Sequence, residues 1–150
     1  MPFKLSSSSL KKLEGIDPKL AAVVKRAIEI TKVDFGVTEG LRTLATQKKY
    51  VAAGKSQTMN SKHLTGDAVD LVAYVGSKIS WEEKLYDDLA DAMKQAAKEK
   101  GVALRWGAAW QVDDITKFNG TMEQATIQYI DLRRSQGKRP FIDGPHFELA

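Results

Sequence analysis

Residues 61–70 read SKHLTGDAVD, and the last three of them begin the apolar run AVDLVAY at 68–74. An apolar run of this length, next to polar and glycine-containing sequence, predicts a strand that is buried on both faces. Asp70 lies inside the run, and a carboxylate is costly to bury unless a partner compensates its charge. His63, one of only two histidines in the chain, lies seven residues earlier. The stretch therefore predicts a buried strand with a polar site at its start.

Helices and further strands are predicted on both sides of this strand. Apolar residues at helical spacing, bounded by capping residues or glycine, predict helices at 18–31, between Thr43 and Gly54, from 80 to Gly101, and at 121–135. Further strands are expected at 35–40, 102–107 and 145–150, with loops at 55–67 and 108–120. Because there is no regular β-α-β alternation, we predict an α+β domain: a small, mostly antiparallel sheet with flanking helices and the polar site at the sheet face.

Three polar stretches give local predictions. SWEE at 80–83 fits a capping box that opens the third helix, with Trp81 on its apolar face. SSSS at 6–9 predicts a flexible or capping stretch. RRSQGKRP at 133–140 predicts a basic turn that could contact phosphates. Its charges form no long stripe, so a solvated loop is the better interpretation and no nucleic-acid partner is expected.

Composition limits the classes of protein and of site. The chain has 150 residues, the length of one ordinary domain, so residues 1–150 are expected to form a single domain. The absence of cysteine excludes disulfides and thiolate ligands, so a transition-metal site must use histidine and carboxylate. The net charge of +4 suits an anionic partner, although a solubilising surface explains it more simply. With no secretory signal or membrane-spanning run, we expect the protein to stay in the cytosol unless it is released.

The two histidines have similar settings and, with Asp70, could form a metal site. His146 follows the stiff turn DGP at 143–145 and begins the last predicted strand, where alternation places it on one face with Glu148. A catalytic zinc site needs three protein ligands and one open position. His63, Asp70 and His146 would supply these three ligands.

Two further residues carry chemistry that such a site needs. Asp143, three residues before His146, could accept the proton of the attacking water without being a ligand. Arg42 lies between a predicted strand and a predicted helix, where a cation could stabilise developing negative charge. Other interpretations stay open: Asp67 competes with Asp70, Asp143 could be only a turn residue, Arg42 could pair with Glu39, and Glu148 could accept a hydrogen bond from a ligand or face water.

Four blocks of sequence resemble the family of zinc D,D-carboxypeptidases and L,D-peptidases that cut bacterial cell-wall peptides. SKHLTGDAVDL (61–71) fits its S-x-H-x-x-G-x-A-x-D pattern, and DGPHFEL (143–149) fits its C-terminal D/E-x-x-H element. VTEGLRTLATQKKYVAAGKS (37–56) resembles its upstream block, and LRWGAAW (104–110) resembles its W-G-x-x-W segment. The blocks keep the family's order. Within the family, the chain is most similar to the small phage endolysins that are L-alanyl-D-glutamate peptidases.

The resemblance implies a function and a role for each candidate residue. It implies zinc at His63, Asp70 and His146, Asp143 as the catalytic base, and Arg42 as a contact to the substrate or the oxyanion. The expected enzyme hydrolyses the L-alanyl-D-glutamate bond of peptidoglycan stem peptides, acts as a monomer, and reaches the wall from the host cytoplasm after holin-type release. Two alternatives remain: a D-alanyl-D-alanine carboxypeptidase or dipeptidase, and a non-catalytic, zinc-stabilised cell-wall-binding module.

Some residues near these blocks keep two interpretations. Trp106 and Trp110 line the cleft or pack in the core, and Gln47 points inward to support either the site or the packing. Residues 111–140 are longer and more helical than in the short relatives, so no regulatory loop is carried over. Asp113-Asp114 could help to bind calcium, but adjacent aspartates are usually a solvated turn, and calcium is not assigned.

Overall fold

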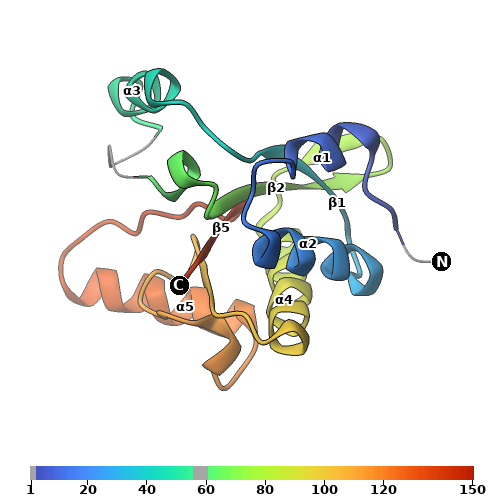
Figure 1. Ribbon diagram of the computed structural model, residues 1–150. Coiled ribbons are helices and arrows are strands. Elements are labelled where there is room, and N and C mark those ends of the chain that lie inside the picture. The colour runs from blue at the N-terminus through green and yellow to red at the C-terminus, as the bar shows by residue number, and fades with distance from the viewer. Residues whose placement is uncertain (1–2, 56–60) are drawn as a thin grey trace.

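The computed structural model describes residues 3–55 and 61–150 and consists of helices packed on a small sheet (Figure 1). The helices are α1 (Ser7–Lys12), α2 (Pro18–Ile30), α3 (Leu44–Ala52), α4 (Glu83–Lys100) and α5 (Met122–Ser135), with 3-10 turns η1 (Lys62–Thr65) and η2 (Ile115–Lys117). The strands are β1 (Asp34–Glu39), β2 (Ala68–Val75), β3 (Lys78–Ser80), β4 (Leu104–Trp106) and β5 (His146–Leu149). The predicted α+β class is confirmed.

The five strands form one antiparallel sheet in the order β1-β2-β5-β4, with β3 pairing with part of β2. Asp70 on β2 lies directly opposite His146 on β5, and residues that face each other across a ladder project from the same side of a sheet. Their neighbours Val69 and Phe147 project from the other side and are fully buried in the core. The register therefore brings Asp70 and His146 together on the face opposite the core.

The core side of the sheet is covered by α2 and α4, which pack against each other (Figure 1). α2 begins as its sequence predicts, since the Asp17 carboxylate accepts a hydrogen bond from the Lys19 amide at 2.9 Å and Pro18 occupies the first turn. α5 begins at a capping box in which Thr121 and Gln124 bond each other's backbone amides. In the described residues, no helix is long and apolar enough to cross a membrane.

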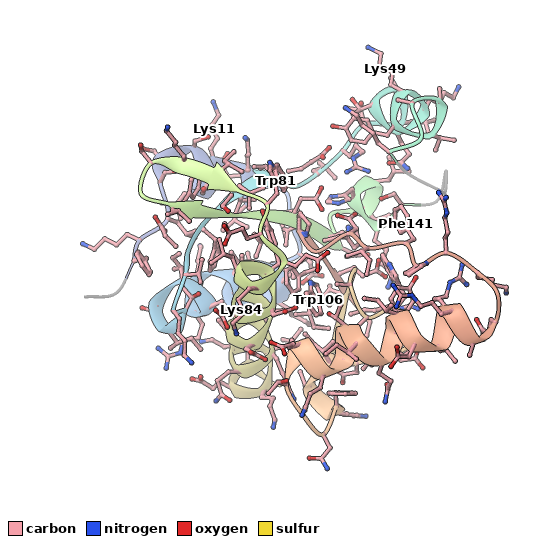
Figure 2. The ribbon with its side chains drawn as sticks, turned by 180° about the vertical axis from the view of Figure 1, so that it is seen from behind. Lys11, Lys49, Trp81, Lys84, Trp106 and Phe141 are labelled. Carbon is pink, nitrogen blue, oxygen red and sulfur yellow. The ribbon has the colours of Figure 1, made fainter. Side chains whose placement is uncertain are left out.

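The start of α4 differs from the prediction. SWEE does not form a capping box: Ser80 pairs with Ala73 at the end of β3, and Glu82 is the N-cap without a side-chain hydrogen bond. Trp81 precedes the helix, is 66% exposed and stacks on Tyr86 instead of joining the apolar face (Figure 2). Ser80 pairs with Ala73 in the β2–β3 hairpin, and this strand pairing overrides the capping signal.

Two segments predicted as loop or flexible contain short helices. In the SSSS stretch, Ser6 caps α1, and the buried Ser9 hydroxyl accepts a hydrogen bond from the Val37 amide at 2.9 Å, which ties α1 to β1. In the predicted loop 55–67, residues 56–60 lie outside the described residues. The remainder contains η1, which carries His63.

Candidate active site and metal centre

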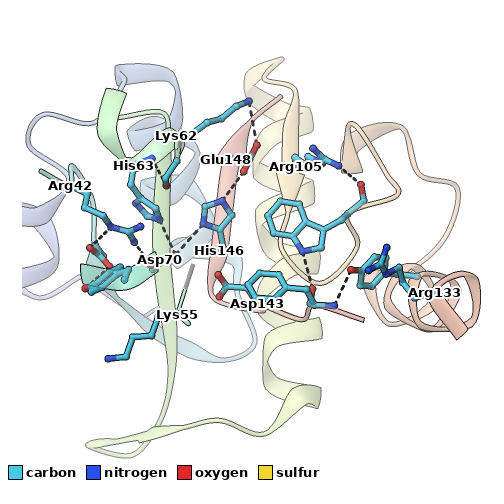
Figure 3. A pocket seen from close by; sticks show the side chains of 16 residues that line it. Arg42, Lys55, Lys62, His63, Asp70, Arg105, Arg133, Asp143, His146 and Glu148 are labelled. Carbon is cyan, nitrogen blue, oxygen red and sulfur yellow. Dashed lines mark hydrogen bonds and ion pairs between the residues drawn. The ribbon is translucent and has the colours of Figure 1, made fainter. Parts of the chain in front are cut away.

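The three predicted metal ligands come together at the open face of β2 and β5. In the described residues, the ligand atoms of His63, Asp70 and His146 all lie within 4.8 Å of one another. Asp70 Oδ1 is 3.2 Å from His63 Nε2 and 3.4 Å from His146 Nδ1 (Figure 3). The competing residue Asp67 follows η1, and its carboxylate accepts a hydrogen bond from the Thr65 hydroxyl at 2.9 Å.

The hydrogen bonds on the far side of each imidazole fit a zinc ion. His63 Nδ1 is 2.9 Å from the Gly40 carbonyl, and His146 Nε2 is 2.8 Å from Glu148 Oε1. Both partners are acceptors, so each ring keeps a proton there, and the nitrogen that faces Asp70 is the one that could bind a metal ion after losing its proton. Two imidazoles and one carboxylate form the ligand set of a catalytic zinc site with an open position. Glu148 therefore contacts His146, a proposed ligand, instead of facing water.

The electrostatics of this group favour a bound cation. Burial opposes the charge of Asp70, but hydrogen bonds with His146 and His63 hold its pKa well below the usual range. Burial also opposes protonation of His146, yet Asp70 and Glu148 raise its pKa to about 9. In the metal-free protein a proton therefore occupies this site, and a metal ion would displace that proton on binding.

Arg42 is fixed beside the three candidate ligands by several partners. Its Nε donates to Glu39 at 2.7 Å, its Nη1 donates to the buried Gln47 at 2.6 Å, and its Nη2 is 3.6 Å from Asp70 Oδ2. The guanidinium also lies 4.5 Å from the centre of the Tyr50 ring. Arg42 thus pairs with Glu39 and also approaches the site, two interpretations that the sequence left as alternatives. Gln47 contacts the site through Arg42.

Asp143 lies in the same pocket but is not part of the group of ligand atoms. Its amide donates to the Gly107 carbonyl at 2.9 Å, and its own carbonyl accepts from the His146 amide at 3.0 Å. Burial, with a smaller contribution from the nearby Asp70, raises the pKa of Asp143 to about 6. A half-buried carboxylate with this pKa can hold or release a proton near neutral pH.

The pocket has a volume of about 690 Å³ and contains residues that the sequence did not single out. Trp110 lines it, with its ring 5.5 Å from His146, whereas Trp106 is fully buried in the core and donates to the Gly144 carbonyl (Figure 2). The residues missed by the sequence are Tyr50, Lys55, Ser61, Lys62, Arg105, Tyr129, Arg133 and Phe141. Arg105 could have been found, because it alternates with the buried Leu104 and Trp106 along one strand.

Of the two aspartates considered for calcium, Asp114 has a structural role. Asp114 Oδ1 caps η2 by accepting from the Thr116 amide at 3.0 Å and its hydroxyl at 2.7 Å, and it also accepts from the Leu104 amide at 3.2 Å. This carboxylate therefore connects η2 to β4.

Comparisons with known proteins identify related sequences. All 150 residues match the family model described as phage L-alanyl-D-glutamate peptidase. The chain is 35% identical over 154 aligned residues to the L-alanyl-D-glutamate peptidase of Escherichia phage T5, with 100% of both chains covered. It is 29% identical over 107 residues to the L-alanyl-D-glutamate peptidase of Listeria phage A118, covering 69% of this chain and 37% of that protein.

A solved structure agrees with the fold. The crystal structure of Serratia marcescens L-Ala D-Glu endopeptidase ChiX is similar with a TM-score of 0.74 and 34% sequence identity, covering 99% of this chain and 91% of that one. Because the family match spans residues 1–150, the chain belongs to the phage L-alanyl-D-glutamate peptidase family.

Proposed function

We propose that the protein is a zinc-dependent L-alanyl-D-glutamate endopeptidase that hydrolyses peptidoglycan stem peptides and lyses the bacterial host as a phage endolysin. The observation that carries this proposal is the group of His63, Asp70 and His146 with Asp143 beside it in one pocket. The full-length relative named for this activity supports the choice of bond.

His63, Asp70 and His146 would hold the zinc ion. When bound, zinc supplies a Lewis acid that acidifies water and polarises the scissile carbonyl. Glu148 and the Gly40 carbonyl keep the two imidazoles in the tautomers that a metal requires. These contacts fix the ligands before the substrate arrives, which lowers the cost of reaching the reactive geometry.

Asp143 would accept the proton of the attacking water and later donate it to the leaving amine. Its main chain is held in the pocket by backbone hydrogen bonds to Gly107 and His146. Arg42 would stabilise the negative charge that develops on the carbonyl oxygen, since it is oriented by Glu39 and Gln47.

The alternatives are less well supported. A D,D-carboxypeptidase would use the same ligands and base, but the T5 and ChiX proteins are named for cleavage between L-alanine and D-glutamate. A non-catalytic wall-binding module would need neither Asp143 nor the oriented Arg42. We propose further that the protein acts as a monomer, without nucleic acid, and reaches the wall from the host cytoplasm after holin-type release.

Ligand variants test the metal assignment. His63→Ala, Asp70→Ala and His146→Ala should each lose bound zinc, measured by elemental analysis, and lose cleavage of an L-alanyl-D-glutamate peptide. Asp67→Ala is the matched control, because its carboxylate bonds Thr65 in the same loop; it should keep both zinc and activity. An Asp70→Ala protein that is fully active without zinc would refute the ligand set.

A further inference from the structure

The pocket has two unequal sides. Arg42 lies on one side of the His63–Asp70–His146 group, and Arg105 and Arg133 lie on the other (Figure 3). Arg105 comes from β4 and Arg133 from α5, so the second side is built from elements that contribute no metal ligand. We name this second side the arginine wall; it consists of Arg105, Trp110, Tyr129, Arg133 and Phe141.

The Arg105 guanidinium is anchored by groups that carry no negative charge. Its Nη2 donates to the backbone carbonyl of Trp110, and its guanidinium lies 5.2 Å from the centre of the Trp110 ring. Its Nε is buried and has no hydrogen-bond partner within the described part of the chain. Glu148 is its cross-strand neighbour, but that carboxylate bonds His146 and pairs with Lys62 at 3.3 Å.

Arg133 is held in a similar way. Its Nε donates to the Arg139 carbonyl at 3.1 Å. One turn earlier on α5, the Tyr129 hydroxyl accepts from the Phe141 amide at 3.1 Å, which fixes the following loop against the helix. A carbonyl orients a guanidinium but does not neutralise it, whereas a carboxylate does both.

This arrangement leaves positive charge available at the arginine wall. Across residues 3–55 and 61–150, neither Arg105 nor Arg133 forms an ion pair with a carboxylate within 4.0 Å. By contrast, Arg42 pairs with Glu39 and Asp70. A substrate anion at the wall would therefore gain charge-assisted hydrogen bonds that no protein group already takes.

We propose that the arginine wall binds the free carboxylate of the D-glutamate residue on the leaving side of the scissile bond, with Arg105 as the principal contact; this rests on the proposed endopeptidase function. A glutamate residue has two carboxyl groups, and a linear peptide continues through one of them at most. The other remains an anion close to the scissile amide. A planar guanidinium matches such a carboxylate in a bidentate geometry.

The position of Asp143 gives the direction. The group that donates a proton to the leaving amine must lie on the leaving side of the bond. In Figure 3, Asp143 lies beside His146, and Asp70 lies between it and Arg42, so Asp143 is on the side of the His63–Asp70–His146 group that faces the arginine wall. The alanine carbonyl is thus directed toward Arg42 and the D-glutamate residue toward the arginine wall, which makes the wall a determinant of specificity for an acidic residue.

Two peptides that differ at one group test this assignment. One contains an L-alanyl-D-glutamate bond with the free carboxylate, and in the other that carboxylate is a carboxamide. The wild-type protein should cleave the acid with a kcat/KM roughly 10- to 100-fold above that of the amide, the range of one charge-assisted contact. Arg105→Gln should remove most of this preference by raising KM for the acid, and Arg105→Lys should restore part of it.

A second variant and a control distinguish a loss of substrate preference from misfolding. Arg133→Gln lies on a surface helix and should lower the preference while keeping the thermal unfolding midpoint and the zinc content. Arg134→Gln, an exposed neighbour on α5 outside the pocket, should leave the preference unchanged. Equal cleavage of both peptides by the wild-type protein would refute carboxylate binding at the arginine wall but not the endopeptidase function. An equal loss of activity toward both peptides in Arg105→Gln would do the same. Failure to cleave either peptide would overturn the endopeptidase function and the wall with it.

Discussion

Asp143 is the residue at which the proposed catalysis can be tested separately from the proposed metal binding. It shares the pocket with the three proposed ligands, but it is not part of the group whose ligand atoms lie within 4.8 Å of one another. Asp143→Asn keeps the size of the side chain and removes its ability to accept a proton. We expect the variant to keep its zinc and its fold and to lose kcat by about 10²- to 10⁴-fold.

Paired kinetic and metal measurements check this expectation. Asp113→Asn is a suitable control, because Asp113 is exposed and does not line the pocket. Wild-type kcat in Asp143→Asn would show that another group takes the proton, and loss of zinc would show that Asp143 is itself a ligand.

Among single residues, the sequence predicts those that must have a partner because they are polar and buried. Asp70 in an apolar strand requires a partner, and the two histidines are the available ones, so the cluster of three could be inferred. Arg133 and Tyr129 could not, because only the packing of α5 brings them to the pocket. Trp110 likewise differs from Trp106 only through the loop that turns it toward His146.

Among the elements, α4 carries a carboxylate that destabilises the fold at neutral pH. Burial, together with Glu123 and Asp91, raises the pKa of Asp87 to about 6. Between pH 4 and 6 the folded protein therefore binds more protons at this residue than the unfolded chain does, so this contribution to stability falls as pH rises through that window.

Asp87→Asn mimics the protonated side chain. Because Asp87 is only partly buried, we discount the effect for solvent screening to about 1 kcal/mol or less, which is roughly 2–4 °C in Tm. The variant should melt above the wild-type protein at pH 7.5, and the difference should vanish at pH 4. Asp131→Asn, exposed on α5, serves as the control. A variant that melts at or below the wild-type temperature at pH 7.5 would contradict this account.

Gly107, in the loop between β4 and η2, contacts the turn that carries Asp143. The Gly107 amide donates to the His146 carbonyl at 2.8 Å, and the Gly107 carbonyl accepts from the Asp143 amide at 2.9 Å. A Cβ at residue 107 would lie 2.2 Å from the Asp143 carbonyl oxygen. Gly107→Ala should therefore displace Asp143, destabilise the fold by about 1–3 kcal/mol, and lower kcat/KM of the folded protein.

Gly76→Ala is the comparison for this variant. Its Cβ would meet no heavy atom within 4 Å, although the φ of 65° adds a backbone cost of about 1 kcal/mol. It should lose stability but keep full activity. If Gly107→Ala also keeps full activity, contact with Gly107 does not position the turn that carries Asp143.

Helices and strands were predictable where local signals and tertiary contacts agree. The Asp17-Pro18 start of α2 and the Thr43 cap of α3 are local hydrogen bonds, and the structure confirms both. The SWEE prediction was wrong because the β2–β3 hairpin uses Ser80 for strand pairing. Gly76, which has a positive φ in the turn of this hairpin, is the sequence signal for the hairpin.

For the whole molecule, we propose that residues 1–150 form a single domain whose stability is linked to zinc. The core is one cluster that includes α2, α4 and the sheet, and two of the three proposed ligands lie on strands of that sheet. Unfolding should therefore be one cooperative transition. Zinc at 100 times its Kd stabilises a folded protein by about 2.7 kcal/mol.

Calorimetry with and without a chelator tests this linkage. Removal of zinc should lower Tm by several degrees, and added zinc should restore it. The same chelator should not change the Tm of Asp70→Ala, which serves as the control. Two separate transitions, or a Tm that does not respond to zinc, would contradict a single metal-linked domain.

The most direct test of the central claim is digestion of purified peptidoglycan, with fragments identified by mass spectrometry, in the presence and absence of chelator and added zinc. We predict new L-alanine carboxyl ends and D-glutamate amino ends that disappear with chelator and return with zinc. Loss of terminal D-alanine alone, or no fragments from folded and zinc-loaded protein, would contradict the proposed endopeptidase.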